Sequence, residues 1–116
     1  MGKVIKVNLE SKQVSLIEGE IHTSLFHQKN LSGTGIYLNR TQEYTYTTEQ
    51  NQNLILFILS GSGELQFKEN LVEPITLQAT RGDLFYIPNS MYFKISNLTT
   101  DIFIAAIIEV NFTLSH

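Results

Sequence analysis

Four side chains of this sequence have the types and spacing needed for small-molecule chemistry. Tyr44 and Tyr46 alternate with threonines, so one face of a β-strand here would carry two phenols. A phenol combines a large apolar ring with a hydrogen-bonding tip, which suits a binding pocket. Glu49 is the best carboxylate for acid–base catalysis, and His27 is a candidate general base if its strand lines the interior. The alternatives are ordinary strand composition on a sheet surface for the tyrosines and an exposed loop position for Glu49.

The sequence offers little for metal or thiol chemistry. His22 and His27 are five residues apart, so on a regular strand they face opposite sides and cannot chelate one metal together. His116 is the last residue of the sequence. There is no cysteine, which excludes disulfides, thiolate nucleophiles and cysteine-ligated metal sites. We therefore expect no metal and no other cofactor.

The composition is typical of a single globular domain spanning residues 1–116. Of these residues, 42% are hydrophobic and 16% are charged. The net charge is −3 at pH 7 and the eight basic residues are scattered, so we expect no nucleic-acid partner. The longest apolar runs, 54–59 and 102–108, are too short to span a bilayer, so we expect no membrane partner. The sequence does not open with a charged and then apolar segment, and we expect a cytoplasmic protein.

Hydrophobic residues alternate with a period of two along most of the chain, and no long helical stripe occurs. Short segments rich in Ile, Leu, Phe, Tyr and Thr predict β-strands. They cover residues 4–7, 21–27, 35–38, 43–47, 54–59, 64–68, 74–77, 84–87, 91–95 and 102–109. Residues 60–63 contain the glycines that a tight hairpin needs. Many short strands predict an all-β, antiparallel sandwich or barrel, for which the jelly roll is one common arrangement.

The stretch 82–97 resembles the second signature motif of the cupin family. Gly82, Pro88 and Asn97 stand where that motif has its glycine, proline and asparagine. The metal-binding histidine of the motif corresponds to Phe93, and its second glycine corresponds to Ser90. A phenyl ring has no lone pair to donate to a metal. The resemblance therefore implies the cupin architecture without the usual metal chemistry.

The stretch 54–65 is similar to the other cupin motif, a strand followed by a glycine turn and a returning strand. The glutamate ligand of that motif falls on Leu54, seven residues before Gly61. The preceding pair of histidine ligands falls on Thr47 and Glu49, or on Thr48 and Gln50. The resemblance covers about residues 35–110 and implies an RmlC-like jelly-roll β-barrel that lacks the metal-binding ligands.

Two classes of function remain open. In the first, the chain is a metal-free cupin-like module that binds a small molecule or has a structural or sensory role. Its pocket would be lined by Tyr44, Tyr46, Leu54, Leu56 and Phe93. Alternatively, Leu54 and Phe93 fill a packed interior. In the second, it is a metal-independent isomerase, epimerase or cyclase acting on a carbohydrate-like or other polar metabolite. Its catalytic groups would be Tyr44, Tyr46, Glu49 and His27.

We also expect a homodimer. Segments 4–7 and 102–108 are more hydrophobic than half-exposed strands require. The resemblance implies pairing through edge strands, which a chain with many strands must protect. A twofold dimer is the commonest closed arrangement.

Overall fold

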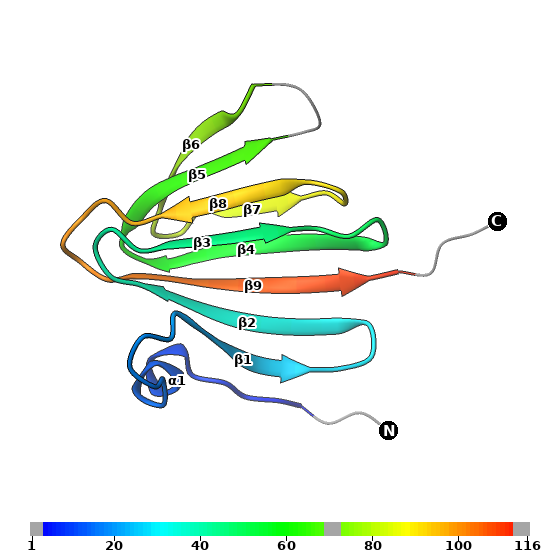
Figure 1. Cartoon of the computed structure of the whole chain (residues 1–116). Coiled ribbons are helices and arrows are strands. Elements are labelled where there is room, and N and C mark those ends of the chain that lie inside the picture. The colour runs from blue at the N-terminus through cyan, green and yellow to red at the C-terminus, as the bar shows by residue number, and fades with distance from the viewer. Residues whose placement is uncertain (1–3, 69–72, 113–116) are drawn as a thin grey trace.

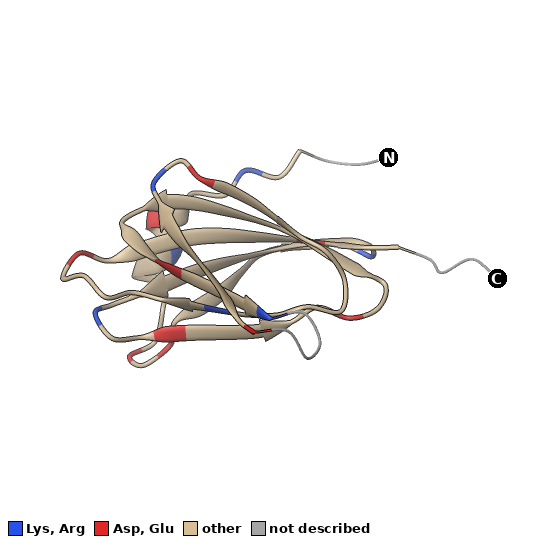
Figure 2. Ribbon diagram, turned by 90° about the horizontal axis from the view of Figure 1, so that it is seen from above, with Lys and Arg blue, Asp and Glu red and all other residues tan. Residues whose placement is uncertain are grey.

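The computed structural model describes residues 4–68 and 73–112, and within them the strands form two antiparallel sheets that face one another (Figures 1 and 2). The five-stranded sheet has the order β1 (His22–His27), β2 (Leu31–Leu38), β9 (Phe103–Asn111), β4 (Gln52–Ser60) and β7 (Leu84–Ile87). The four-stranded sheet has the order β3 (Glu43–Thr47), β8 (Tyr92–Ser96), β5 (Ser62–Lys68) and β6 (Ile75–Thr80). Helix α1 (Leu9–Val14) precedes the strands and is the one helix among the residues that the structure describes.

The chain passes from one sheet to the other six times, and two of these crossings are glycine corners. Gly61 lies between β4 and β5, and Gly82 lies between β6 and β7; both have positive φ angles, +86° and +93°. A Cβ at Gly61 would come within 2.6 Å of the carbonyl oxygen of Ile102, so only glycine fits there. The expected hairpin at 60–63 is therefore wrong. The segment forms a corner, because β4 and β5 belong to different sheets.

Apolar side chains from both sheets meet in one core. Leu54, Leu56 and Ile58 alternate along β4 and are fully buried, and Phe93 of the facing β8 is buried in the same cluster. This arrangement places Leu54, Leu56 and Phe93 in the interior, where both a lined pocket and a packed core would have them. The even spacing of inward residues explains why the strands could be predicted from a period of two.

The expected N-terminal strand is wrong, a short helix was not predicted, and the two sheets are open at their edges. Residues 4–7 form no strand, and Val4 is 99% exposed. Helix α1 follows instead, begun by Asn8, whose side-chain oxygen accepts a hydrogen bond from the Ser11 amide at 3.0 Å. A helix of six residues is too short to show a helical stripe in the sequence. The described strands also do not close into a continuous hydrogen-bonded barrel, because β1, β7, β3 and β6 remain sheet edges.

In the part of the chain that the structure describes, no helix is long and apolar enough to cross a membrane.

Candidate functional site

The interior of the sandwich is polar on the side of β1, β2 and β3. In the five-stranded sheet, His27 pairs with Ser32, and Ser32 pairs with Glu109, so the three side chains share one face. This is the inner face, because Phe103, Ala105 and Ile107 at the same parity of β9 belong to the core. Tyr44 and Tyr46 of β3 pack against that core from the opposite sheet. We call Ser32, Tyr44, Tyr46, Gln52 and Glu109 the polar cluster.

Hydrogen bonds join the polar cluster across both sheets. The Tyr46 hydroxyl donates to Gln52 Oε1 at 3.2 Å, and Gln52 Nε2 donates to Glu109 Oε2 at 3.3 Å. The Ser32 hydroxyl donates to the same oxygen of Glu109 at 3.2 Å. Four strands, β3, β4, β9 and β2, thus bring one phenol, one amide, one carboxylate and one hydroxyl together. These groups can donate hydrogen bonds to a bound molecule and accept them from it.

Sequence reasoning missed Ser32, Gln52 and Glu109, although two of them carry a usable signal. Every second side chain of β9 points inward, and Glu109 is the fourth in this series. An apolar residue would be expected at that position. Gln52 precedes Leu54 by two residues and is therefore inward as well; it is 5% exposed. A polar residue in an inward position of an apolar strand costs free energy unless it is hydrogen-bonded, so it points to a network or a site.

Four rings form a row along the inner side of β3. The rings of Tyr44 and Tyr46 are stacked, with centroids 6.4 Å apart and planes inclined by 17°. The ring of His22 lies edge-on to that of Tyr44, with centroids 5.7 Å apart, and the ring centroids of Tyr46 and Phe93 are 5.8 Å apart. Both predicted tyrosines therefore lie on one face of their strand, as expected, and Phe93 connects them to the core.

Burial raises the pKa of both tyrosine hydroxyls further above neutral pH. It raises the pKa of Tyr44 to about 12, with smaller contributions from Tyr46 and Glu109. Burial also raises the pKa of Tyr46, although the hydrogen bond with Gln52 acts in the opposite direction. At neutral pH both phenols are protonated. They can donate hydrogen bonds or protons, but they cannot act as phenolate bases.

The two histidines of β1 share the inner face, so their expected opposite orientation is wrong. His22 pairs with Ile36 and His27 pairs with Ser32, whereas the register of β1 shifts between Ser24 and Phe26. This β-bulge inserts one extra residue and restores the inward direction of His27. His22 and His27 both remain exposed at the sheet edge.

The other predicted site residues differ in how deeply they are buried. Leu54, Leu56 and Phe93 are fully buried in the core, so their role in lining a ligand pocket stays a prediction. Glu49 is exposed in the turn after β3, and its amide donates to Gln52 Oε1 at 3.2 Å. Burial is the main cause of the raised pKa of Tyr46, and the carboxylate of Glu49 adds a smaller upward contribution.

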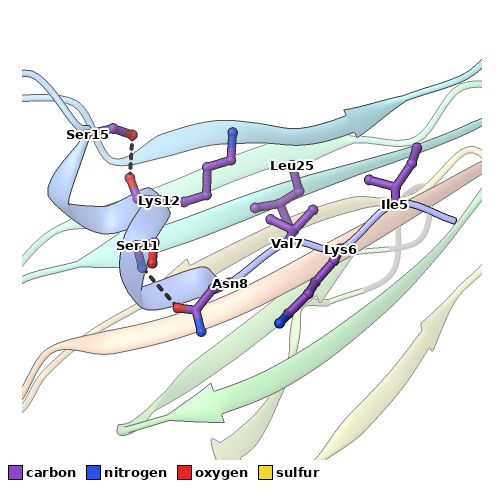
Figure 3. Close-up of a pocket in the computed structure, with 8 residues that line it drawn as sticks. All are labelled: Ile5, Lys6, Val7, Asn8, Ser11, Lys12, Ser15 and Leu25. Atoms are coloured by element: carbon purple, nitrogen blue, oxygen red, sulfur yellow. Dashed lines mark hydrogen bonds between the residues drawn. The ribbon is translucent and has the colours of Figure 1, made fainter.

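Two hollows lie away from the polar cluster. One, of about 360 Å³, lies between residues 5–8, α1 and Leu25 (Figure 3), and the ionisable residues in its lining are Lys6 and Lys12. The other, of about 120 Å³, lies on the opposite, apolar side of the sandwich. It is lined by Leu65, Phe67, Leu77, Phe85, Tyr86, Ile87, Pro88 and Met91. Neither brings an acid and a base together. Among the described residues, no group of three His, Cys, Asp or Glu could hold a metal.

The architecture is that of known double-stranded β-helix proteins. A conserved protein from Klebsiella pneumoniae with this domain superposes with a TM-score of 0.79 at 14% identity, over 94% of this chain and 91% of that one. An RmlC-like cupin family protein from Methanocaldococcus jannaschii gives 0.70 at 18% identity, over 96% and 92%. The cupin domain of Cnp3 from Schizosaccharomyces pombe gives 0.68 at 15% identity, over 78% of this chain and only 64% of that one.

No family model matches the sequence, and no curated protein matches it. The likeness to solved structures is nevertheless consistent across these proteins, and the chain has the cupin fold. At these identities the likeness establishes the fold alone, and the site has to be interpreted from its own residues.

Proposed function

We propose that this chain is a metal-free cupin-fold module that binds a small polar molecule at the polar cluster. The observation that carries the proposal is the hydrogen-bonded series Tyr46–Gln52–Glu109–Ser32, which crosses from one sheet to the other. Inward positions of sandwich strands normally carry apolar residues. Four polar groups in such positions are explained if a ligand uses their remaining hydrogen-bonding capacity.

The charges of the inner face limit the class of ligand. Glu109 contributes a carboxylate, and the described inward positions of both sheets contain no Lys or Arg. An anion such as a phosphate would meet the Glu109 carboxylate with no lysine or arginine beside it to compensate the charge. We therefore expect a neutral or cationic molecule with hydrogen-bond donors, such as a polyol or an amine, whose apolar side could rest on the tyrosine rings.

A thermal-shift screen followed by NMR titration tests the proposal. The probes are a set of polyols, a set of primary amines and inorganic phosphate. We expect at least one polyol or amine to raise the melting temperature and phosphate to have no effect. Glu109→Gln and Tyr46→Phe should each weaken binding about tenfold, the loss of one good hydrogen bond.

Matched control variants are available on the outer face of the four-stranded sheet. Glu43→Gln and Tyr92→Phe make the same chemical changes at exposed positions. Both should leave affinity unchanged. A ligand whose affinity does not respond to Glu109→Gln and Tyr46→Phe would refute binding at the polar cluster.

A second candidate is a metal-independent isomerase, epimerase or cyclase. The observation in its favour is the bulge in β1, which places His27 in the same row as Glu109, two strands away. A histidine, a carboxylate and a tyrosine are the groups that such enzymes of this superfamily use. We expect a ligand found in the screen to be recovered unchanged, with no exchange of its carbon-bound hydrogens in D₂O. Exchange that is abolished by His27→Asn would favour the enzyme instead.

A further inference from the structure

The hollow beside α1 is separate from the polar cluster. Its volume is about 360 Å³, within the range of small-molecule sites. Helix α1 forms one wall and residues 5–8 form the other, with Leu25 of β1 between them (Figure 3). We call this space the N-terminal hollow. It lies on the outer face of the five-stranded sheet, whereas the polar cluster lies on the inner face.

The bulge in β1 supplies the apolar floor of the N-terminal hollow. Gly33 and Gly35 of β2 face outward, because Ile36, the next residue, belongs to the core. A Cβ at Gly33 would stand 2.5 Å from the ring of Phe26, and one at Gly35 would stand 3.2 Å from Leu25 Cδ2. The bulge thus turns two consecutive apolar side chains outward, and the glycines of the neighbouring strand leave room for them.

The walls of the hollow depend on how the N-terminal segment docks. The Tyr37 hydroxyl of β2 donates to the Leu9 carbonyl at 2.6 Å and fixes the start of α1 over the sheet. Residues 4–7 form no strand there, so they leave a space beside β1 that a paired strand would have closed. The segment is therefore not the edge strand expected from the sequence. Segment 102–108 is not an edge either, because β9 lies between β2 and β4.

The charge of the N-terminal hollow is positive, although the whole chain has a net charge of −3. Lys6 and Lys12 line it, and no aspartate or glutamate does. Among the described residues the ion pair is that of Lys94 with Glu43, so neither lining lysine has a carboxylate partner there. Lys12 is half-buried. An ammonium group that is partly removed from water without a partner favours the arrival of an anion.

We propose that the N-terminal hollow binds a small anion with an apolar body, such as a carboxylate or a phosphate on a short alkyl chain. The apolar body would rest on Val7 and Leu25, and the anion would lie toward the lysines. Lys12 extends from α1 and Lys6 from the opposite wall, and they point to different sides (Figure 3), so their charges flank the hollow. The Ser11 hydroxyl lies in the same lining and adds a donor. This inference is independent of the ligand proposed for the polar cluster.

NMR titration of the full chain tests the site, with octanoate and octyl phosphate as probes below their micelle-forming concentrations. We expect at least one of them to shift the amide signals of the lining residues saturably, and the tighter one identifies the preferred anion. Two control molecules each lack one half of the proposed chemistry: 1-octanol has no charge, and acetate has no apolar body. Both should bind at least tenfold more weakly than the better probe.

Lysine variants test the role of charge. Lys6→Gln and Lys12→Gln should each weaken binding about threefold, and the double variant about tenfold, as expected for partly exposed ion pairs. Lys29→Gln is the matched control, because Lys29 is exposed in the turn between β1 and β2 and does not line the hollow. It should leave the affinity unchanged. The proposal is overturned if neither probe gives saturable shifts at the lining residues, if 1-octanol binds as tightly as the better probe, or if Lys29→Gln weakens binding as much as Lys12→Gln.

Discussion

His22 and His27 point to the same face of β1, although five residues separate them. A regular strand would place them on opposite sides, and the bulge between Ser24 and Phe26 reverses that relationship. The two side chains are nevertheless not neighbours, because this length of strand spans roughly 15 Å. Sharing a face therefore brings His27 toward the polar cluster without creating a two-histidine metal site.

The first prediction concerns metal content. A zinc or iron site needs at least three good ligands, whereas two of the four cupin ligand positions carry Leu54 and Phe93 and a third carries a threonine, so at most Glu49 or Gln50 offers a ligand oxygen. Protein purified without added metal should contain far less than one transition-metal ion per chain by elemental analysis. Close to one Fe, Mn, Ni or Zn per chain, retained after mild chelation, would contradict this expectation.

The second prediction concerns Phe93, which is fully buried between Tyr46 and Phe67 of the flanking strands. Phe93→His should lower the free energy of unfolding by about 2–4 kcal/mol, because it removes a buried ring and introduces an imidazole without partners. It should not create a metal site. Denaturant unfolding measures the loss, with Tyr92→His as the control on the exposed face, expected to cost less than about 1 kcal/mol. A near-neutral Phe93→His would indicate an open, hydrated pocket at this position.

The fold was predictable because its signals are local. Gly82 has a positive φ, which glycine adopts more readily than other residues, and the inward position of Leu54 follows from simple alternation. The site was only partly predictable. Tyr44 and Tyr46 follow from alternation on one strand, whereas their partner Glu109 comes from a strand more than sixty residues later. Such a juxtaposition depends on strand order and register, and a single sequence does not contain either.

The third prediction concerns Asn97, which ends the motif and is fully buried. Its amide nitrogen donates to the carbonyls of Leu38 and Asp101 at 2.8 Å each, and its oxygen accepts from the amide and hydroxyl of Thr99 at 2.9 Å each. Asn97→Asp replaces the donor with an oxygen that faces two carbonyls. We expect a loss of about 3 kcal/mol in unfolding free energy. The control is Asn39→Asp at an exposed position; an equal effect of both changes would show that the network does not matter.

The fourth prediction uses backbone strain at Thr41, whose φ is 70°. A β-branched residue is unfavourable in this left-handed region, and glycine adopts it freely. Thr41→Gly should therefore raise the unfolding free energy by about 0.5–1 kcal/mol, after the entropy of the unfolded glycine is included. Thr45→Gly, on the exposed side of β3, should instead lower it by a similar amount. Urea unfolding of the two variants shows whether each substitution raises or lowers the unfolding free energy. A lower unfolding free energy for Thr41→Gly would refute backbone strain at this residue.

The last prediction follows from the pKa of Tyr44, which burial raises from 10.0 to about 12. Between these values the unfolded chain loses the phenol proton while the folded chain keeps it. The stability that comes from the neutral phenol is therefore fully present below pH 10 and is lost as the pH rises toward 12. We expect roughly 1 kcal/mol of additional loss in this window, because solvent near the partly buried ring screens the phenolate. Urea unfolding at pH 9 and near pH 11.5 measures the change, and Tyr44→Phe should reduce the loss by that amount. Equal pH dependence of the two proteins would place Tyr44 in contact with water and outside the polar cluster.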